Sequence, residues 1–278
     1  MSIQWYPGHI AKAERTLQEQ LKRVDVVLEV RDARIPLATH HPQVPQWVGG
    51  KTKLLVINRM DMIPSYIQKQ WEEWFEERGE TPYFTNSQLG QGVEAVTKAA
   101  QAAGAKMNEK RASRGMLPRP VRAVVIGFPN VGKSALINRL LKKRVVDSAR
   151  RPGVTKQLRW VRISDAIELL DAPGVIPTRL SNQQDALKLA ICEDIGEASY
   201  DNQQVAAGMI ELFQDLNLTH LLNSRYELEP TASNGEFYLE QLAEKRHKGD
   251  VERTARELLN DFRKGLIGNI ALELPPNS

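Results

Sequence analysis

The chain has 278 residues, with 38 Lys plus Arg against 34 Asp plus Glu and a formal net charge of +4. No apolar run approaches the ~18 residues of a membrane span, and the first residues, MSIQWYPGHIAKAE, lack the charged-then-apolar layout of a signal peptide. We therefore expect a cytoplasmic protein with no membrane partner. The single cysteine, Cys192, excludes an internal disulfide and a cysteine-cluster zinc site, which agrees with a reducing compartment.

The charge is distributed unevenly along the chain. Residues 1–180 hold 29 Lys plus Arg against 17 Asp plus Glu, a net +12, whereas residues 181–278 hold 9 against 17, a net −8. The excess is concentrated in 106–122 and 139–162. Such density favours a polyanionic partner, and RNA is the commonest in the cytoplasm. The alternative is a solvated face with no partner.

Hydrophobic periodicity predicts strands that alternate with helices in the first part of the chain. The expected elements are a helix over 10–23, a strand over 26–32, a strand over 53–58, a helix over 66–78, a strand over 81–86 and a helix over 93–103. Residues 104–120 are basic and contain Gly115, Pro118 and Pro120, so we expect a linker there. A strand over 123–128, a helix over 133–141 and further strands within 158–174 follow.

From about residue 182 the periodicity is helical, with helices expected over 184–195, 203–216, 235–246 and 251–263. This order predicts an α/β domain over 1–180, with a mostly parallel sheet, and an all-helical domain over 181–278. The helical domain is a candidate for RNA binding. Its negative charge argues against a basic RNA clamp, although basic side chains of the last helix could gather on one face: Arg253, Arg256, Arg263 and Lys264. Ordinary solvent contact is the alternative.

The stretch GFPNVGKS, residues 127–134, matches the phosphate-loop pattern and lies between an expected strand and an expected helix. Gly127 and Gly132 let the backbone curl so that N–H groups point at phosphates. Lys133 would neutralise the β- and γ-phosphates, and the Ser134 hydroxyl would bind Mg²⁺. The nucleotide contacts expected from this loop are Asn130, Val131, Gly132, Lys133, Ser134 and Ala135.

Two further stretches fit a nucleoside triphosphate site. Asp171 begins D-A-P-G at the end of an apolar run, where its carboxylate can hold the Mg²⁺ water shell, and Gly174 can offer its N–H to the γ-phosphate. Between this motif and the phosphate loop, RPGVTK offers Thr155 as a residue that closes over Mg²⁺. Alone, each could be an ordinary turn or loop residue.

The stretch NRMD, Asn58, Arg59, Met60 and Asp61, follows a strand and predicts the base preference. The Asp61 carboxylate can accept two hydrogen bonds from the N1–H and N2–H₂ edge of guanine, a donor pair that adenine lacks. We therefore expect GTP as substrate and GDP as product. The usual motif has Lys where this chain has Arg59, which puts base affinity in question. Asn86 or Ser87 would bring backbone near the base. An ATP-using enzyme stays possible only if Asp61 lies outside the base pocket.

Along the chain, both base loops precede the phosphate loop, the threonine loop and D-x-P-G, which is a circular permutation of the usual order. In this order the sequence resembles the circularly permuted GTPases of the ribosome biogenesis GTPase A family. The resemblance covers nearly the whole chain, including WYPGHIAKA at 5–13 and VERTARELLNDFRKGLIGNIALE at 251–273. It implies a P-loop GTPase fold and, as partner, the maturing large ribosomal subunit with its rRNA. No DNA partner is expected.

The resemblance also assigns two residues. Val175 and Ile176 stand where a conventional GTPase has a water-orienting Gln, and the family gives that role to the histidine at the position of His9. Alternatively, His9 only caps the helix expected at residue 10. Asn130 matches the residue that similar GTPases use to hold K⁺, so hydrolysis is expected to depend on K⁺. The resemblance further implies that the large ribosomal subunit stimulates hydrolysis. A GTP-gated RNA scaffold with incidental hydrolysis is the competing function.

Overall fold

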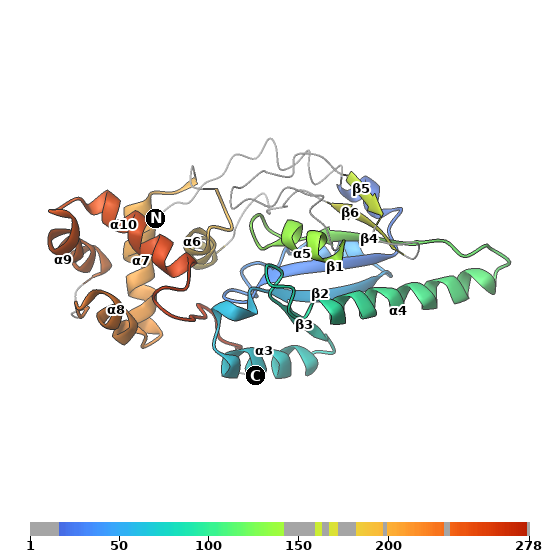
Figure 1. The fold of residues 1–278 in the computed structure, drawn as a ribbon, viewed down its shortest axis with the longest axis horizontal. Coiled ribbons are helices and arrows are strands. Elements are labelled where there is room, and N and C mark those ends of the chain that lie inside the picture. The colour runs from blue at the N-terminus through green and yellow to red at the C-terminus, as the bar shows by residue number, and fades with distance from the viewer. Residues whose placement is uncertain are drawn as a thin grey trace.

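The computed structural model describes residues 17–141, 159–162, 167–171, 182–196, 199–230 and 234–276. A β-sheet with flanking helices forms one half of the molecule, and a group of helices forms the other (Figure 1). Within the described residues, no helix has the length and apolar character needed to cross a membrane. Of the helix expected over 10–23, residues 17–21 are helical and residues before 17 lie outside the description.

The sheet has six strands in the order β3-β2-β1-β4-β6-β5. In chain order these are β1 (Val26–Asp32), β2 (Thr52–Asn58), β3 (Pro82–Thr85), β4 (Val121–Ile126), β5 (Arg159–Arg162) and β6 (Ile167–Asp171). Every neighbouring pair is parallel except β5 with β6. All seven residues of the central strand β1 are buried, as expected for a parallel strand covered on both faces. The predicted α/β fold with a mostly parallel sheet is confirmed.

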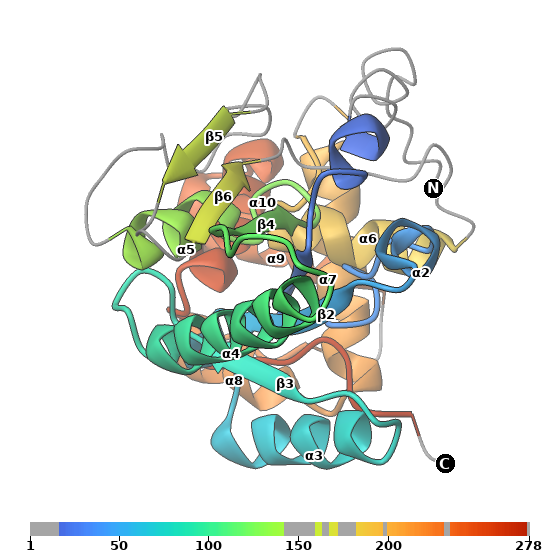
Figure 2. The same ribbon diagram turned by 90° about the vertical axis from the view of Figure 1, so that its right-hand side faces the viewer.

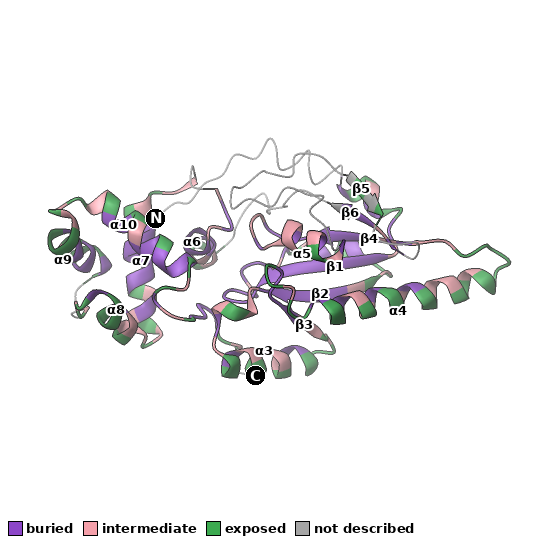
Figure 3. Cartoon of the chain, in the orientation of Figure 1, coloured by how far each residue is buried: buried purple, intermediate pink, exposed green. Residues whose placement is uncertain are grey.

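Helices cover both faces of this sheet. The elements are α2 (Val44–Val48), the 3₁₀ turn η1 (Met60–Met62), α3 (Ser65–Glu76), α4 (Val93–Ala112) and α5 (Lys133–Leu140). On one face, Leu28 and Val30 of β1 pack in one cluster with Val96 of α4. Val27, which points the other way because side chains alternate along a strand, packs with Trp47 of α2. Figure 3 shows the buried residues of the sheet and of the helices packed on it in purple.

Helix α4 is longer than its sequence pattern predicts. We expected it to end at 103 and a linker to begin at Gly104, but the helix continues to Ala112, so the prediction was wrong for 104–112. Gly104 is not a helix end: a Cβ added there would lie 2.0 Å from Cγ2 of Val121. The glycine therefore lets α4 approach β4 closely, a packing reason for glycine within a helix.

The helical half contains α6 (Gln183–Cys192), α7 (Asn202–Asp215), α8 (Thr219–Tyr226), α9 (Gly235–His247) and α10 (Val251–Arg263). The first residues of four of these helices are capped by the side chains of Asn182, Asp201, Asn234 and Asp250. Arg263 does not share an exposed basic face with Arg256, because its buried guanidinium donates to the carbonyls of Ala190 and Ile191.

The segment after α10 returns to the sheet half of the molecule. Ile270 N donates to Met62 O at 2.8 Å, and Leu272 N donates to Arg34 O at 2.9 Å. The Glu273 carboxylate accepts from the backbone N–H groups of Leu37 and Ala38. These bonds fix the last described residues against the loops that follow β1 and β2.

Candidate nucleotide site

The loops that follow β2, β3 and β4 meet at Asn58, the last residue of β2. Its Oδ1 accepts from Thr85 Oγ1 at 3.1 Å, Ser87 N at 3.0 Å and Ser87 Oγ at 2.7 Å. Its Nδ2 donates to Val131 O at 2.8 Å. One buried amide therefore joins both predicted base loops to the predicted phosphate loop, as the carboxyl ends of parallel strands allow.

Two glycines allow the phosphate loop to take this path. Gly132 has φ +100°, and a Cβ there would lie 2.0 Å from Asn58 Nδ2. Gly127 has φ +152°, and a Cβ there would lie 2.3 Å from Val30 O of β1. Both positions combine a backbone conformation that L side chains rarely adopt with a close approach to another strand end. Only glycine satisfies both requirements.

Lys133 begins α5, directly after the loop, and is buried. Its ammonium donates to Phe128 O at 2.6 Å, so the side chain lies across the loop that it follows. Ser134 and Ala135 come next, in the first turn of α5, where helix N–H groups and the helix dipole favour anions. Asp171 ends β6, which pairs with β4 in the register Val125 with Asp171. The Asp171 backbone thus lies one strand away from the start of the phosphate loop.

Three of the predicted residues lie outside the described part of the chain. These are His9, Thr155 and Gly174. Their roles, and that of the Asp171 side chain, stay predictions.

The base loop is held by Arg59, which adopts a left-handed backbone conformation with φ 65°. Its NH1 donates to Asp32 Oδ2 at 3.0 Å and its NH2 to Asn130 O at 2.5 Å. A guanidinium can reach two acceptors on different loops at once, whereas a lysine presents a single nitrogen. Met60 is half-buried and Asp61 is exposed, both within η1. Asn86 is buried and its Oδ1 accepts from Gln88 N and Leu89 N, which shapes the second base loop.

Sequence reasoning did not find the buried ion pair that lies at the end of β1, next to the base loop. Arg34 NH2 lies 2.7 Å from Asp32 Oδ2, and both side chains are fully buried. Burial alone would raise the pKa of Asp32, but Arg34 and Arg59 hold that pKa below its ordinary value. Arg34 NH2 also donates to Cys192 O at 3.3 Å, in the last turn of α6. The available signal was R-D-A-R, residues 31–34, a charged run at the end of a buried strand.

The end of α6 also contacts the phosphate loop. Asn130 Nδ2 donates to Glu193 O at 2.6 Å. The next residue, Asp194, is fully buried, and neither of its carboxyl oxygens has a hydrogen-bond partner among the described residues. Burial, together with the nearby charge of Asp32, raises the pKa of Asp194 to about 8. The helical half therefore places a carbonyl and a buried acid beside the nucleotide loops.

P-loop GTPases have a glycine-rich loop between a central parallel strand and a helix, and an Asn-x-x-Asp loop whose asparagine bonds to it. This chain has both, with Asn58 as that asparagine, and its base loops come first along the chain. A family model described as "50S ribosome-binding GTPase" matches residues 122–234. The chain is 34% identical to ribosome biogenesis GTPase A of Bacillus cereus, over 99% of this chain and 95% of that relative. It is 30% identical to mouse mitochondrial ribosome-associated GTPase 1, over 97% of this chain and 89% of that relative. The chain belongs to the ribosome biogenesis GTPase A family.

Solved structures agree on the fold. The GNP-bound structure of YlqF from T. maritima covers 96% of this chain and 100% of its own, with a TM-score of 0.66 and 23% identity. The GDP-bound structure of the same protein gives a TM-score of 0.69, with 95% and 100% coverage and 23% identity. These structures share the fold of this chain, a permuted GTPase domain followed by helices, and the family identifies the protein as a GTPase.

Proposed function

We propose that this GTPase is a switch in late assembly of the large ribosomal subunit, which binds the precursor particle and its rRNA in the GTP state and leaves after hydrolysis. The observation that carries the proposal is the bond from Asn130 of the phosphate loop to Glu193 O at the end of α6. A ligand changes a conformational equilibrium only through contacts that differ between states. This bond joins the phosphate loop to the helical domain, and in the proposed switch it would change with the bound nucleotide.

A second path supports the same coupling. Arg59 binds both the Asn130 carbonyl and Asp32, and Asp32 binds Arg34, which donates to Cys192 O. A displacement of the phosphate loop on nucleotide exchange would therefore act on the end of α6 at two carbonyls. The helical domain, 181–278, would then change its position relative to the GTPase domain, 1–180.

The proposal also assigns the nucleotide contacts. Lys133 would neutralise the β- and γ-phosphates, and Asp61 would pair with guanine, beside Asn58 and Ser87. Mg²⁺ would be held by Ser134, in the first turn of α5, and by Asp171, at the end of β6, with Thr155 completing the set. Backbone and side-chain contacts to the nucleotide would come from the remaining site residues, Arg59, Met60, Asn86, Val131, Gly132, Ala135 and Gly174.

Asn130 is suited to hold K⁺. An amide nitrogen donates and cannot ligate a cation, so the bond from Nδ2 to Glu193 O leaves Oδ1 as the ligand atom. A K⁺ ion there would supply positive charge to the transition state, in the position of an arginine finger. The helical domain would thereby orient the K⁺ ligand.

His9 would position the attacking water. The test is GTP hydrolysis by the native chain and by His9→Ala, with and without large ribosomal subunits, in potassium and in sodium. We expect stimulation by subunits and by potassium, and a lower kcat with intact nucleotide affinity in the variant. Turnover that stays flat under both additions would favour a GTP-gated RNA scaffold, and unchanged turnover in the variant would remove His9 from the mechanism.

A further inference from the structure

The last turns of α4 and the loop after them extend past the sheet, away from the helical half (Figure 1). We call residues 105–119 the basic arm. Its tip faces the viewer in Figure 2. Residues 112–118 are all exposed, and no other described element covers them.

The basic arm carries four cations with no ion pair among the described residues: Lys106, Lys110, Arg111 and Arg114. Cations on exposed helix faces elsewhere do form such pairs. On the same helix Lys98 lies 2.8 Å from Glu94, and on α10 Arg256 lies 2.8 Å from Glu252. The arm has one acidic residue, Glu109. Its positive charge is therefore available to a partner.

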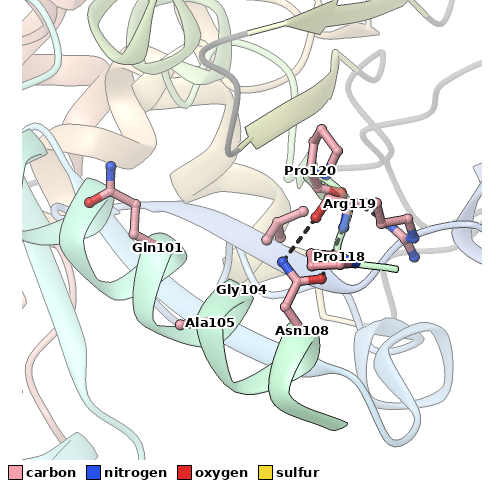
Figure 4. A pocket seen from close by; sticks show the side chains of 8 residues that line it. Gln101, Gly104, Ala105, Asn108, Pro118, Arg119 and Pro120 are labelled. Atoms are coloured by element: carbon pink, nitrogen blue, oxygen red, sulfur yellow. Dashed lines mark hydrogen bonds between the residues drawn. The ribbon is translucent and has the colours of Figure 1, made fainter. Parts of the chain in front are cut away.

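The arm is also ordered by its own contacts. Asn108 Nδ2 donates to Arg119 O at 3.0 Å and its Oδ1 accepts from Arg119 N at 3.1 Å, which folds the loop back along α4 (Figure 4). Arg111 Nε donates to Leu117 O at 3.1 Å. The Arg119 guanidinium pairs with Asp25 at 2.8 Å, which anchors the base of the arm. An ordered surface loses less conformational entropy on binding.

The loop between helix and anchor leaves a shallow groove of about 470 Å³, lined by Gln101, Ala105, Asn108 and Pro118 (Figure 4). At the tip, Met116 is 40% and Leu117 is 83% exposed. Such side chains at a charged tip can pack against the sugars of a wide, shallow minor groove once phosphates have been engaged.

The cations stand on two sides of the helix. At about 100° per residue, Lys106 and Lys110 lie within about 40° of each other and Arg111 lies about 140° from Lys106. Arg114 follows in the tip. A helix end with cations on opposite sides fits between two rows of phosphates, and the wide, shallow minor groove of an RNA duplex offers two such rows.

We propose that the basic arm binds double-helical rRNA end-on, as a contact separate from the helical domain. The inference rests on the proposed ribosomal function, which it deepens by naming a surface. The arm lies at the far end of α4 from the helical half, so the two contacts would hold the particle at separated points (Figure 1). RNA affinity through the arm is electrostatic and depends steeply on salt.

The test uses the variant K106Q/K110Q/R114Q, which leaves the Arg111 bond to Leu117 O intact. Binding to a short rRNA duplex and to isolated large subunits is measured over a series of salt concentrations. Losing three phosphate contacts makes the slope of log K against log salt less steep by about 2.7. This corresponds to an affinity up to about 500-fold weaker at about 0.1 M salt. The control K69Q/R78Q/K98Q removes the same charge from ion-paired sites of the GTPase domain and should keep the native slope.

A native slope in the arm variant, or an equal fall in the control, would overturn the inference. Circular dichroism and GTP hydrolysis without RNA should be unchanged in both variants, since no substituted residue lies in the nucleotide loops. Leu117→Ser should weaken binding without changing the slope. The test separates the arm from the proposed switch. Equal binding of the native protein to large subunits with GDP and with a triphosphate analogue would refute the switch. A reduced salt slope in the arm variant would still support the arm.

Discussion

Replacing Asn58 by Ala would disconnect the base loops from the phosphate loop. Asn58 is 3% exposed, and its amide makes bonds to Thr85 Oγ1, Ser87 N, Ser87 Oγ and Val131 O. The two hydroxyls can rotate to other acceptors, but the Ser87 N–H and the Val131 carbonyl would stay buried without this partner. At about 1–3 kcal/mol for each orphaned group, the expected loss of unfolding free energy is about 2–6 kcal/mol.

Urea unfolding measures this loss, and fluorescent-nucleotide titration measures its functional consequence. Affinity for both GDP and GTP should fall. The phosphate loop would lose its bond from Asn58 to Val131 O, and both nucleotides bind to that loop. Asn108→Ala is the matched control: it also orphans one backbone N–H and one backbone carbonyl, but both belong to Arg119 at the half-buried base of the arm. We expect a change below about 1 kcal/mol there and native nucleotide affinity. A stability loss below about 1 kcal/mol for Asn58→Ala would refute the reasoning.

Three further outcomes are expected. Asp61→Asn should reduce the preference for GTP over ATP in competition binding, and an unchanged preference would place Asp61 outside the base site. Gly132→Ala should abolish nucleotide binding, because its Cβ would meet Asn58 Nδ2 at 2.0 Å, whereas Gly115→Ala, at φ +71° with nothing within 4 Å, should bind normally. Asp194, with a pKa raised from 3.8 to about 8, favours its proton in the folded state, so unfolding free energy should fall between about pH 4 and pH 8, by up to about 1.4 kcal/mol per unit. Asp194→Asn should remove this dependence. If the free energies of unfolding of the variant and the native chain differed by the same amount at about pH 5 and about pH 8, the assignment would be contradicted. The charged groups that act on Asp194 are Asp32, Arg34, Arg59 and Lys133.

Sequence periodicity placed the sheet well because its strands are nearly continuous apolar runs. The expected 26–32 coincides with β1, and 53–58 and 81–86 lie within one or two residues of β2 and β3. The prediction failed at α4, where Gly104 resembles a break but serves a close contact with Val121. It also missed the short helices α2 and α8, and the five residues of α2 give too few turns for a periodic pattern.

At the site, local motifs predicted which loops would meet, and the bonds of Asn58 show them together. What the motifs could not predict are contacts with residues that belong to no motif. The contact of Asn130 with Glu193 spans 63 positions, and that of Arg34 with Cys192 spans 158. Arg263 was likewise open to interpretation as a surface cation, and its buried bonds to the carbonyls at the end of α6 depend on how two helices pack.

The proposed switch requires nucleotide state to control subunit binding through the phosphate loop and the end of α6. Cosedimentation with large ribosomal subunits, for the native chain and for Asn130→Ala, tests this coupling most directly. We predict that native protein sediments with subunits in a GTP analogue and is released in GDP, and that the variant loses most of this difference although Asn130 lies in the GTPase domain. Equal sedimentation of the native protein in both nucleotides would contradict the coupling.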